Sequence, residues 1–185
     1  MALTSSTVFT SIISEYSSAF PNIEIEIQNH QESVDLKRQG IDLQVLPCAV
    51  NISDDSYIQF SLLSYSSHFV ASKQYVASHP PITLENLGDQ RVLTNRYNAD
   101  LLDYGINISM QSDDLNLLRY MAINGQGIAF IPELHSKPFI ESGDLVEVLS
   151  DIDYPDQHLT LLYPSAMFLP KKVRVLKDLF KQKFG

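Results

Sequence analysis

The chain has 185 residues, 44% of them hydrophobic, which is enough for the packed core of one domain or of two small lobes. Acidic residues outnumber basic ones 22 to 13, and the resulting net charge of −9 argues against direct binding to DNA or to anionic membranes. The single cysteine, Cys48, excludes an intrachain disulfide, and we expect a cytoplasmic protein because the chain shows neither a secretory signal nor an apolar run near the roughly 20 residues that span a bilayer.

The first part of the chain predicts two helices and two strands. Residues 4–6 can supply the N-cap of a helix whose apolar residues share one face: Val8, Phe9, Ile12, Ile13 and Tyr16. Isoleucine alternates with glutamate over residues 23–27, which predicts a half-exposed strand. Residues 31–39 predict a short helix that stops at Gly40, and residues 41–46 predict the next strand.

Strands and helices continue to alternate, which favours an α/β fold. Residues 57–72 are β-prone and exceed the common strand length of about five to six residues, so they form either two strands or one strand that crosses between lobes. Residues 79–88 predict a proline-marked connection with a short helical turn. Further strands are predicted over residues 91–95, 106–110, 127–132, 145–149 and 158–163.

Three more helices are predicted in the second half of the chain, one of which Pro132 can open. Asp113 can cap the one before it, whose inward face consists of Leu115, Leu118, Met121 and Ala122, and which stops near residues 124–125. The last helix follows Pro170 and places its apolar face at Val173, Leu176, Leu179 and Phe180. Its lysines and arginine are expected to form the solvated side.

Several segments, taken in order, resemble one known family. They are EYSSAFPNIEIEI, LKRQGIDLQV, HFVASKQYVASHP, DDLNLLRYMAINGQGIAFIP, ESGDLVEVL and LTLLYPSAMFLPKKVRVLKDLF. Their order and spacing resemble the C-terminal effector-binding domain of LysR-type transcriptional regulators over about residues 5–183. The family's N-terminal helix-turn-helix and the first strand of its regulatory domain have no counterpart in the sequence. The resemblance therefore implies contact with DNA only through a module of a longer parent protein.

The resemblance implies the fold of type 2 periplasmic binding proteins, in which two Rossmann-like lobes are joined by two crossover strands. Lobe I would comprise residues 1–66 and 160–185, and lobe II residues 67–159. A small organic effector would bind in the cleft between the lobes and control the arrangement of a dimer or tetramer. The family's mode of pairing implies a homodimer through residues 5–28 and lobe II, which would bury part of Ile12, Ile13, Tyr16 and Ile23–Ile27.

Candidate effector-binding residues follow the predicted strands or begin helices, because ligands of open α/β sheets bind beyond the carboxyl ends of the strands. Arg96 can pair with a carboxylate and Tyr97 can stack on a ring, so we expect an effector that carries a carboxylate. The candidates are Ser5, Ser6, Asn29, His30, Asn95, Arg96, Tyr97, Ser112, Ile131 and Pro132. For each of them a purely structural role, as a cap, a solvated loop residue or part of a wall, is the alternative.

Catalytic and cofactor motifs are not found, so no cofactor is expected. The five histidines show no metal-binding spacing. Gly125 and Gly127 lack the third glycine of a dinucleotide loop, and no nucleophile elbow occurs. Two alternatives to a regulatory domain stay open: a solute-binding protein of a transporter, and an enzyme built on the same fold.

Overall fold

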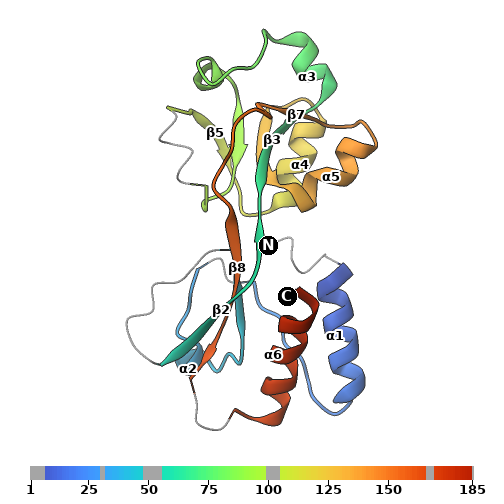
Figure 1. The fold of residues 1–185 in the computed structure, drawn as a ribbon, viewed down its shortest axis with the longest axis vertical. Coiled ribbons are helices and arrows are strands. Elements are labelled where there is room, and N and C mark those ends of the chain that lie inside the picture. The colour runs from blue at the N-terminus through green and yellow to red at the C-terminus, as the bar shows by residue number, and fades with distance from the viewer. Residues whose placement is uncertain (1–6, 30–31, 48–55, 99–104, 166–168, 185) are drawn as a thin grey trace. The chain divides into compact units, whose positions relative to one another are not determined.

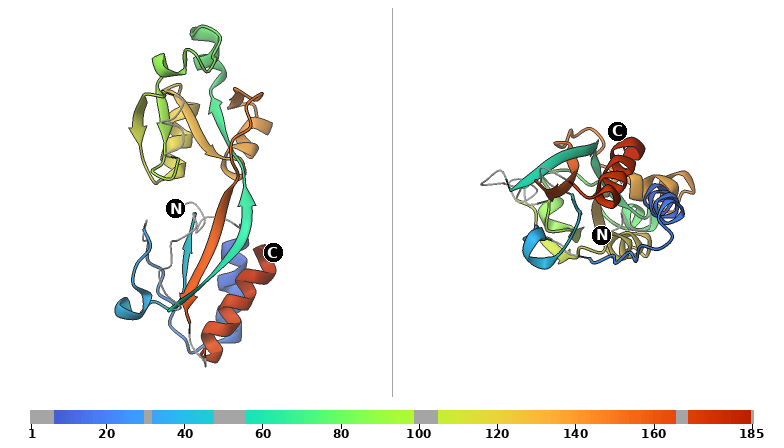
Figure 2. Two further views of the ribbon diagram at one scale, coloured as in Figure 1. Left: turned by 60° about the vertical axis from the view of Figure 1, so that its left-hand side comes forward. Right: turned by 90° about the horizontal axis from the view of Figure 1, so that it is seen from below.

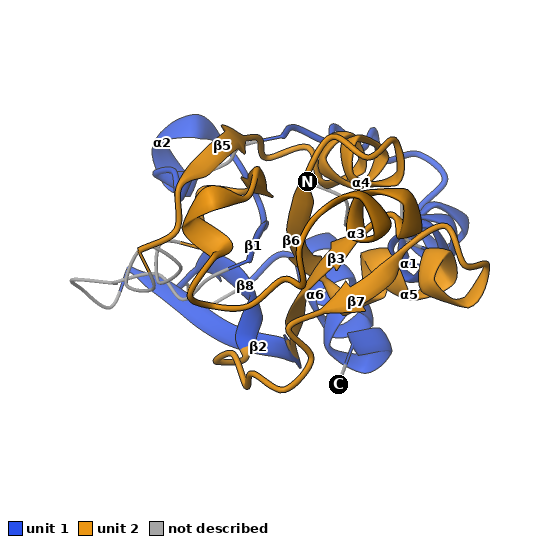
Figure 3. Ribbon diagram, turned by 90° about the horizontal axis from the view of Figure 1, so that it is seen from above, with its two compact units in different colours: residues 1, 3–64, 157–185 blue, residues 2, 65–156 orange. Residues whose placement is uncertain are grey.

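The computed structural model describes residues 7–29, 32–47, 56–98, 105–165 and 169–184. The chain divides into two compact units, shown in different colours in Figure 3. Unit 1 contains Leu3–Ser64 and Gln157–Gly185, and unit 2 contains Tyr65–Asp156. The chain thus leaves unit 1 once and returns to it once, so unit 1 is discontinuous in sequence and unit 2 is continuous.

Unit 1 combines a small sheet with two long helices (Figure 1). Its sheet has the order β1-β8-β2, with β1 antiparallel to β8. The elements of unit 1 are α1 (Thr7–Ala19), α2 (Leu36–Gln39), β1 (Gln44–Leu46), β2 (Tyr57–Tyr65), β8 (Gln157–Pro164) and α6 (Lys171–Phe184).

Helices α1 and α6 pack against each other through the apolar faces that the sequence predicts, and both views of Figure 2 show them side by side. The buried residues of α1 are Phe9, Ile12 and Tyr16, and those of α6 are Val173, Leu179 and Phe180. The rings of Phe9 and Phe180 lie 6.0 Å apart between centroids. The predicted first and last helices are therefore confirmed.

Helix α2 is shorter than predicted, because Asp35 rather than a residue near position 31 begins it. The Asp35 side chain accepts a hydrogen bond from the backbone N–H of Arg38 at 3.1 Å, which is the geometry of an N-cap. Gly40 ends the helix in the left-handed conformation, as predicted. Four residues of helix remain between these two caps.

The predicted strand at residues 23–27 is wrong. Within the described residues, the segment belongs to no strand, since the sheet of unit 1 ends at β1. The alternation itself is present, because Ile23 and Ile25 are half-buried while Glu24 and Glu26 are exposed. A period of two describes how side chains alternate, but a strand also needs a hydrogen-bonded neighbour.

Unit 2 contains a mixed five-stranded sheet in the order β5-β4-β6-β3-β7. Strand β4 is parallel to β5 and β6, whereas β3 is antiparallel to β6 and β7. Its elements are β3 (Ser67–Ala71), α3 (Lys73–Ser78), the 3-10 helix η2 (Leu87–Asp89), β4 (Val92–Thr94), β5 (Ile108–Gln111), α4 (Leu115–Ile123), β6 (Ile128–Pro132), α5 (Glu133–Glu141) and β7 (Val146–Val148). The β-prone stretch 57–72 is indeed two strands, β2 and β3.

Both faces of the unit 2 sheet are covered. Neighbouring residues of a strand point to opposite faces, so Phe69 packs in one apolar cluster and Val70 in the other. In the same way, Val92 packs in the cluster of Phe69, and Leu93 packs in the cluster of Val70. This burial on both sides explains why these strands are continuous apolar runs in the sequence. Among the described residues, no helix is long and apolar enough to cross a membrane.

Candidate functional site

The carboxyl ends of β4, β5 and β6 lie at one edge of the unit 2 sheet, because these three strands are parallel. Polar residues follow β4 and β5 directly, as predicted from the sequence. The backbone N–H of Ser112 donates to the carbonyl oxygen of Thr94 at 2.9 Å, which ties the two strand ends together. This edge is where ligands of open α/β sheets bind.

An ion pair joins the two loops at this edge. Nε of Arg96 lies 2.7 Å from Oδ2 of Asp113, and the backbone N–H of Arg96 donates to Oδ1 of the same carboxylate at 3.5 Å. The Arg96 side chain is 44% exposed and that of Asp113 only 14%. The carboxylate of Asp113 is thus largely covered by protein, whereas the guanidinium of Arg96 remains accessible to solvent.

Asp113 does not cap α4, contrary to the sequence prediction. The cap is Asp114, whose Oδ1 accepts from the backbone N–H groups of Asn116 at 3.0 Å and Leu117 at 3.3 Å. The helix begins one residue later than expected. The side chain of Asp113 is therefore available to pair with Arg96. Because Asp114 occupies two of the N–H groups at the start of α4, these two groups are not available to an anionic ligand.

Asn95 holds the turn after β4. Its Oδ1 accepts from the backbone N–H of Tyr97 at 3.0 Å, an arrangement typical of asparagine in turns. Nearby, Nδ2 of Asn98 donates to Oγ1 of Thr94 at 2.9 Å, and both of these side chains are buried. Both residues belong to the segment 94–98 in which the family resemblance implies effector contacts, but the pairing of their side chains is not predicted from the sequence. The sequence feature that could have indicated this pair is a polar threonine at the end of a strand that is otherwise apolar.

The other candidates at this edge are more buried than Arg96. Ile131 is fully buried in the core cluster that contains Leu93 and Leu118, so its side chain packs inside unit 2. Pro132 is buried as well and precedes α5 as its N-cap residue. Tyr97 and Ser112 are half-buried, and the Ser112 hydroxyl accepts from the backbone N–H of Asp114 at 3.1 Å.

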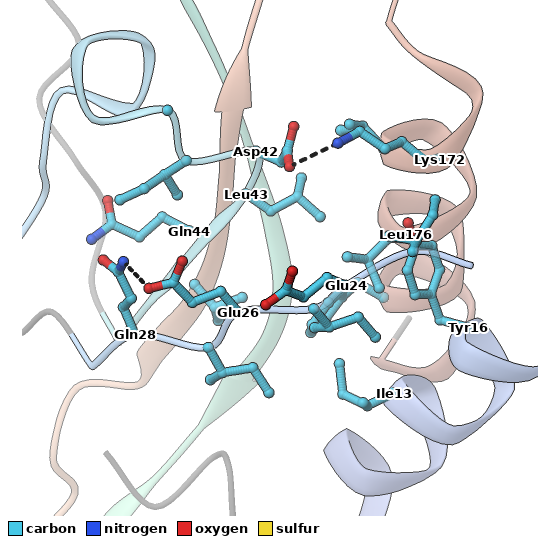
Figure 4. Close-up of a pocket in the computed structure, with 18 of the residues that line it drawn as sticks. Ile13, Tyr16, Glu24, Glu26, Gln28, Asp42, Leu43, Gln44, Lys172 and Leu176 are labelled. Atoms are coloured by element: carbon cyan, nitrogen blue, oxygen red, sulfur yellow. Dashed lines mark hydrogen bonds and ion pairs between the residues drawn. The ribbon is translucent and has the colours of Figure 1, made fainter. Parts of the chain in front are cut away.

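Of the four candidates in unit 1, the structure describes only Asn29. Ser5, Ser6 and His30 lie outside the described residues. Asn29 is exposed and lines a groove in unit 1 with a cavity volume of about 350 Å³, which runs between residues 23–29 and β1 (Figure 4). That residues of both units hold one effector stays a prediction.

A metal centre has no support in the described part of the chain, where no three His, Cys, Asp or Glu side chains gather in a way that could hold an ion. His68 contacts two carboxylates, with Nδ1 3.2 Å from Glu147 and Nε2 3.8 Å from Glu133. These contacts are hydrogen bonds or ion pairs within unit 2.

A family model described as the LysR substrate binding domain matches residues 1–185. The chain is 22% identical over 183 residues to an HTH-type transcriptional regulator of Xanthomonas campestris, and 25% identical over 192 residues to the HTH-type transcriptional regulator PtxR of Pseudomonas aeruginosa. These matches cover 90% and 95% of this chain, but only 53% and 60% of the relatives. The chain thus spans little more than half the length of the relatives it matches.

The fold of the chain is similar to the folds of solved regulatory domains. The regulatory domain of AphB from Vibrio vulnificus matches with a TM-score of 0.77 and 25% identity, covering 96% of this chain and 92% of that domain. The regulatory domain of CrgA from Neisseria meningitidis, a LysR-type transcriptional regulator, matches with a TM-score of 0.79 and 18% identity, covering 95% and 91%.

Proposed function

Because the chain belongs to the LysR substrate-binding domain family, we propose that it binds a small organic effector that carries a carboxylate, at the strand-end edge of unit 2. The fold is the two-lobed, periplasmic-binding-protein-like α/β fold of this family, and the chain is an effector-binding regulatory domain. A transporter's solute-binding protein, the alternative, is not favoured, because the matched relatives regulate transcription. The same relatives suggest a role without catalysis.

The Arg96–Asp113 pair carries the proposal. Asp113 holds the guanidinium in place before any ligand arrives, so little side-chain entropy is lost when an anion binds. Arginine carries several N–H donors in one plane, and the Arg96 side chain stays 44% exposed beside Asp113, so a ligand carboxylate can reach it. The negative charge of Asp113 weakens the attraction, which favours an effector whose other groups add affinity.

A thermal-shift screen of small organic acids tests the proposal, because a ligand that binds only the folded chain stabilises it by about 2.7 kcal/mol at 100 times its Kd. Arg96→Ala should abolish the shift of an acid that stabilises the wild type. Asp113→Asn should keep or increase that shift, since it removes a competing carboxylate. Arg174→Ala, which removes an exposed arginine of α6, is the matched control and should leave the shift unchanged. An acid that stabilises Arg96→Ala as strongly as the wild type would refute the role of Arg96.

Effector binding would act on a larger assembly in the cytoplasm. We place DNA contact in a helix-turn-helix module of a longer protein, and pairing in a homodimer through residues 5–28 and lobe II. Two of the residues expected in that interface are corrected by the structure, since Ile12 and Tyr16 are already buried beside α6. Half-buried Ile13 and exposed Ile27 can still gain burial in a dimer. Sedimentation at rising concentration measures this pairing.

A further inference from the structure

The strand-end edge of unit 2 carries a carboxylate as well as the guanidinium of Arg96. Strand β6 is the neighbour of β4, and their parallel register pairs Leu93 with Ala129. Continued along both strands, that register brings Arg96 beside Pro132, one residue before Glu133. Neighbouring strands lie about 4.8 Å apart. Glu133, the first residue of α5, therefore belongs to the same edge as Arg96.

The two charged groups also lie on the same side of the sheet. Asp113, the partner of Arg96, lies just before α4, and Glu133 begins α5. Helices α4 and α5 pack against each other and against the same apolar cluster on one face of the sheet (Figure 1). The starts of two adjacent helices thus present a guanidinium and a carboxylate, and no ion pair joins Arg96 to Glu133.

The carboxylate of Glu133 is held in place but not neutralised by a basic side chain. Its Oε2 lies 3.8 Å from Nε2 of His68 and 3.4 Å from the hydroxyl of Ser66, and the side chain is 50% exposed. The backbone N–H of Glu133 donates to the carbonyl oxygen of Ser66 at 3.0 Å, which fixes the start of the helix. Within the described residues, no lysine or arginine forms an ion pair with this carboxylate.

Glu147 determines which nitrogen of His68 carries the hydrogen. Nδ1 lies 3.2 Å from Oε1 of Glu147, and because a carboxylate can only accept, Nδ1 is the donor. In the neutral ring Nε2 is then an acceptor, and it can take the hydroxyl hydrogen of Ser66 at 3.2 Å. That contact is shorter than the 3.4 Å from the same hydroxyl to Glu133. With Ser66 donating to His68, the carboxylate of Glu133 keeps its acceptor oxygens for a ligand.

We propose that the effector of this edge carries a protonated amine as well as a carboxylate. Arg96 takes the carboxylate, and the ammonium group donates to the carboxylate of Glu133 and to the hydroxyl oxygen of Ser66. Glu133 and Ser66 are then the residues that determine specificity for an amino acid over a plain acid. This inference rests on the function proposed above, since it uses the same edge and the same arginine.

The opposite charges select against simpler ligands. A plain carboxylic acid meets Arg96 but brings its negative charge toward Glu133, which repels it. A plain amine meets Glu133 but leaves Arg96 with Asp113 alone. A zwitterion satisfies both groups, and because its own charges cancel, it gains little from the net charge of −9 elsewhere on the chain.

Three pairs of probes, each differing only in the amine, test this specificity on the full chain. They are β-alanine and propionate, γ-aminobutyrate and butyrate, and ε-aminohexanoate and hexanoate, whose lengths vary because the site sets the distance between the two charged groups. Calorimetry measures the Kd of each probe. In at least one pair the amine should lower the Kd by about three- to tenfold, the range for a charged pair at a partly exposed site.

Variants assign the two ends of the ligand. Glu133 is exposed, so Glu133→Gln should fold normally, and it should raise the Kd of the amino acid to that of the plain acid. Ser66→Ala should reduce the preference to a smaller extent. Glu141→Gln removes an exposed glutamate at the other end of α5 and should keep the preference of the wild type. Arg96→Ala should abolish binding of both members of the pair.

The outcomes separate this inference from the function on which it rests. The inference is overturned if acids bind through Arg96 but the amine lowers the Kd in none of the three pairs. It is equally overturned if Glu133→Gln keeps the preference for the amino acid. If no probe binds in a way that depends on Arg96, the proposed carboxylate site itself is refuted, and the specificity of Glu133 with it.

Discussion

Asp113 and Asp114 are adjacent carboxylates with different partners, and their substitution should separate the two roles. Asp114 accepts from two N–H groups at the start of α4, so Asp114→Ala should lower the free energy of unfolding by about 1 kcal/mol. Asp113→Ala breaks a partly exposed ion pair and should cost between about 0 and 1 kcal/mol. Urea denaturation measures both values, and a larger loss for Asp113→Ala would contradict the assignment of the cap.

His135 makes stability depend on pH. Burial lowers the pKa of this imidazole below its ordinary value of 6.5, and the positive charge of Arg119 lowers it further. Below about pH 6.5 the unfolded chain therefore takes up a proton more readily than the folded chain, so acid favours unfolding. The free energy of unfolding therefore keeps its full value above about pH 6.5, where the ring is neutral in both states, and it decreases as the pH falls toward the pKa of the folded state.

The variant His135→Gln removes this titration. Between about pH 8 and pH 5 the wild type should lose stability relative to the variant, because only the wild type gains the proton on unfolding. Urea midpoints at several pH values measure the difference between the two proteins. A difference that does not change with pH would show that His135 titrates alike in both states.

At the scale of elements, the joint between α4 and β6 depends on Gly127. A Cβ at this position would collide with the carbonyl oxygen of Arg91. That oxygen also accepts from the backbone N–H of Ile128 at 2.8 Å, so it cannot move without breaking the start of the β4–β6 pairing. Gly127→Ala should therefore cost about 1–3 kcal/mol, as overpacking does.

Gly40→Ala is the matched control for this substitution. A Cβ at Gly40 meets no atom within 4 Å, so only the left-handed conformation, with a φ of +69°, opposes the alanine. The cost should be about 1 kcal/mol. Thermal or urea unfolding of the two variants compares steric with conformational strain, and equal losses would indicate that the backbone at Gly127 relaxes.

The helices that are predicted best from the sequence are those whose apolar face packs against a second helix with an apolar face of its own. Helices α1 and α6 each show one apolar face, and the two faces meet. The strand at 23–27 is mispredicted because alternation does not reveal whether a neighbouring strand exists. Helix α3 was not predicted, although Ser72 caps it by accepting from the backbone N–H of Tyr75 at 3.2 Å. A serine before a short amphipathic turn is a weak signal, since such turns also occur in loops.

The candidate site was predictable in position but not in its internal contacts. The loops after β4 and β5 could be assigned to one edge because parallel strands end together. The ion pair between Arg96 and Asp113 could not be predicted, because it depends on the register between two strands and on the residue at which α4 begins. Ile131 and Pro132 are expected to line the cleft with their backbone groups, and this stays a prediction, while the side chain of Ile131 is buried in the core.

For the whole molecule, the net charge of −9 predicts that the chain alone does not bind DNA. Fluorescence anisotropy of a labelled duplex should stay constant at low salt, where electrostatic attraction is strongest. A basic protein of similar size serves as the positive control. Saturable, salt-sensitive binding by this chain would reveal a basic face strong enough to overcome the excess of carboxylates.

Because Ser64 leads into unit 2 and Gln157 returns from it, the two units are completed at different times on the ribosome. The whole of unit 2 has been translated once Asp156 is made, whereas α1 must wait for α6, which follows unit 2 in the chain. Until then the apolar face of α1 lacks its cover, and the nascent chain presents Phe9, Ile12 and Tyr16 to chaperones. Stalled chains that end before Lys171 should accordingly aggregate or recruit a chaperone through their first helix.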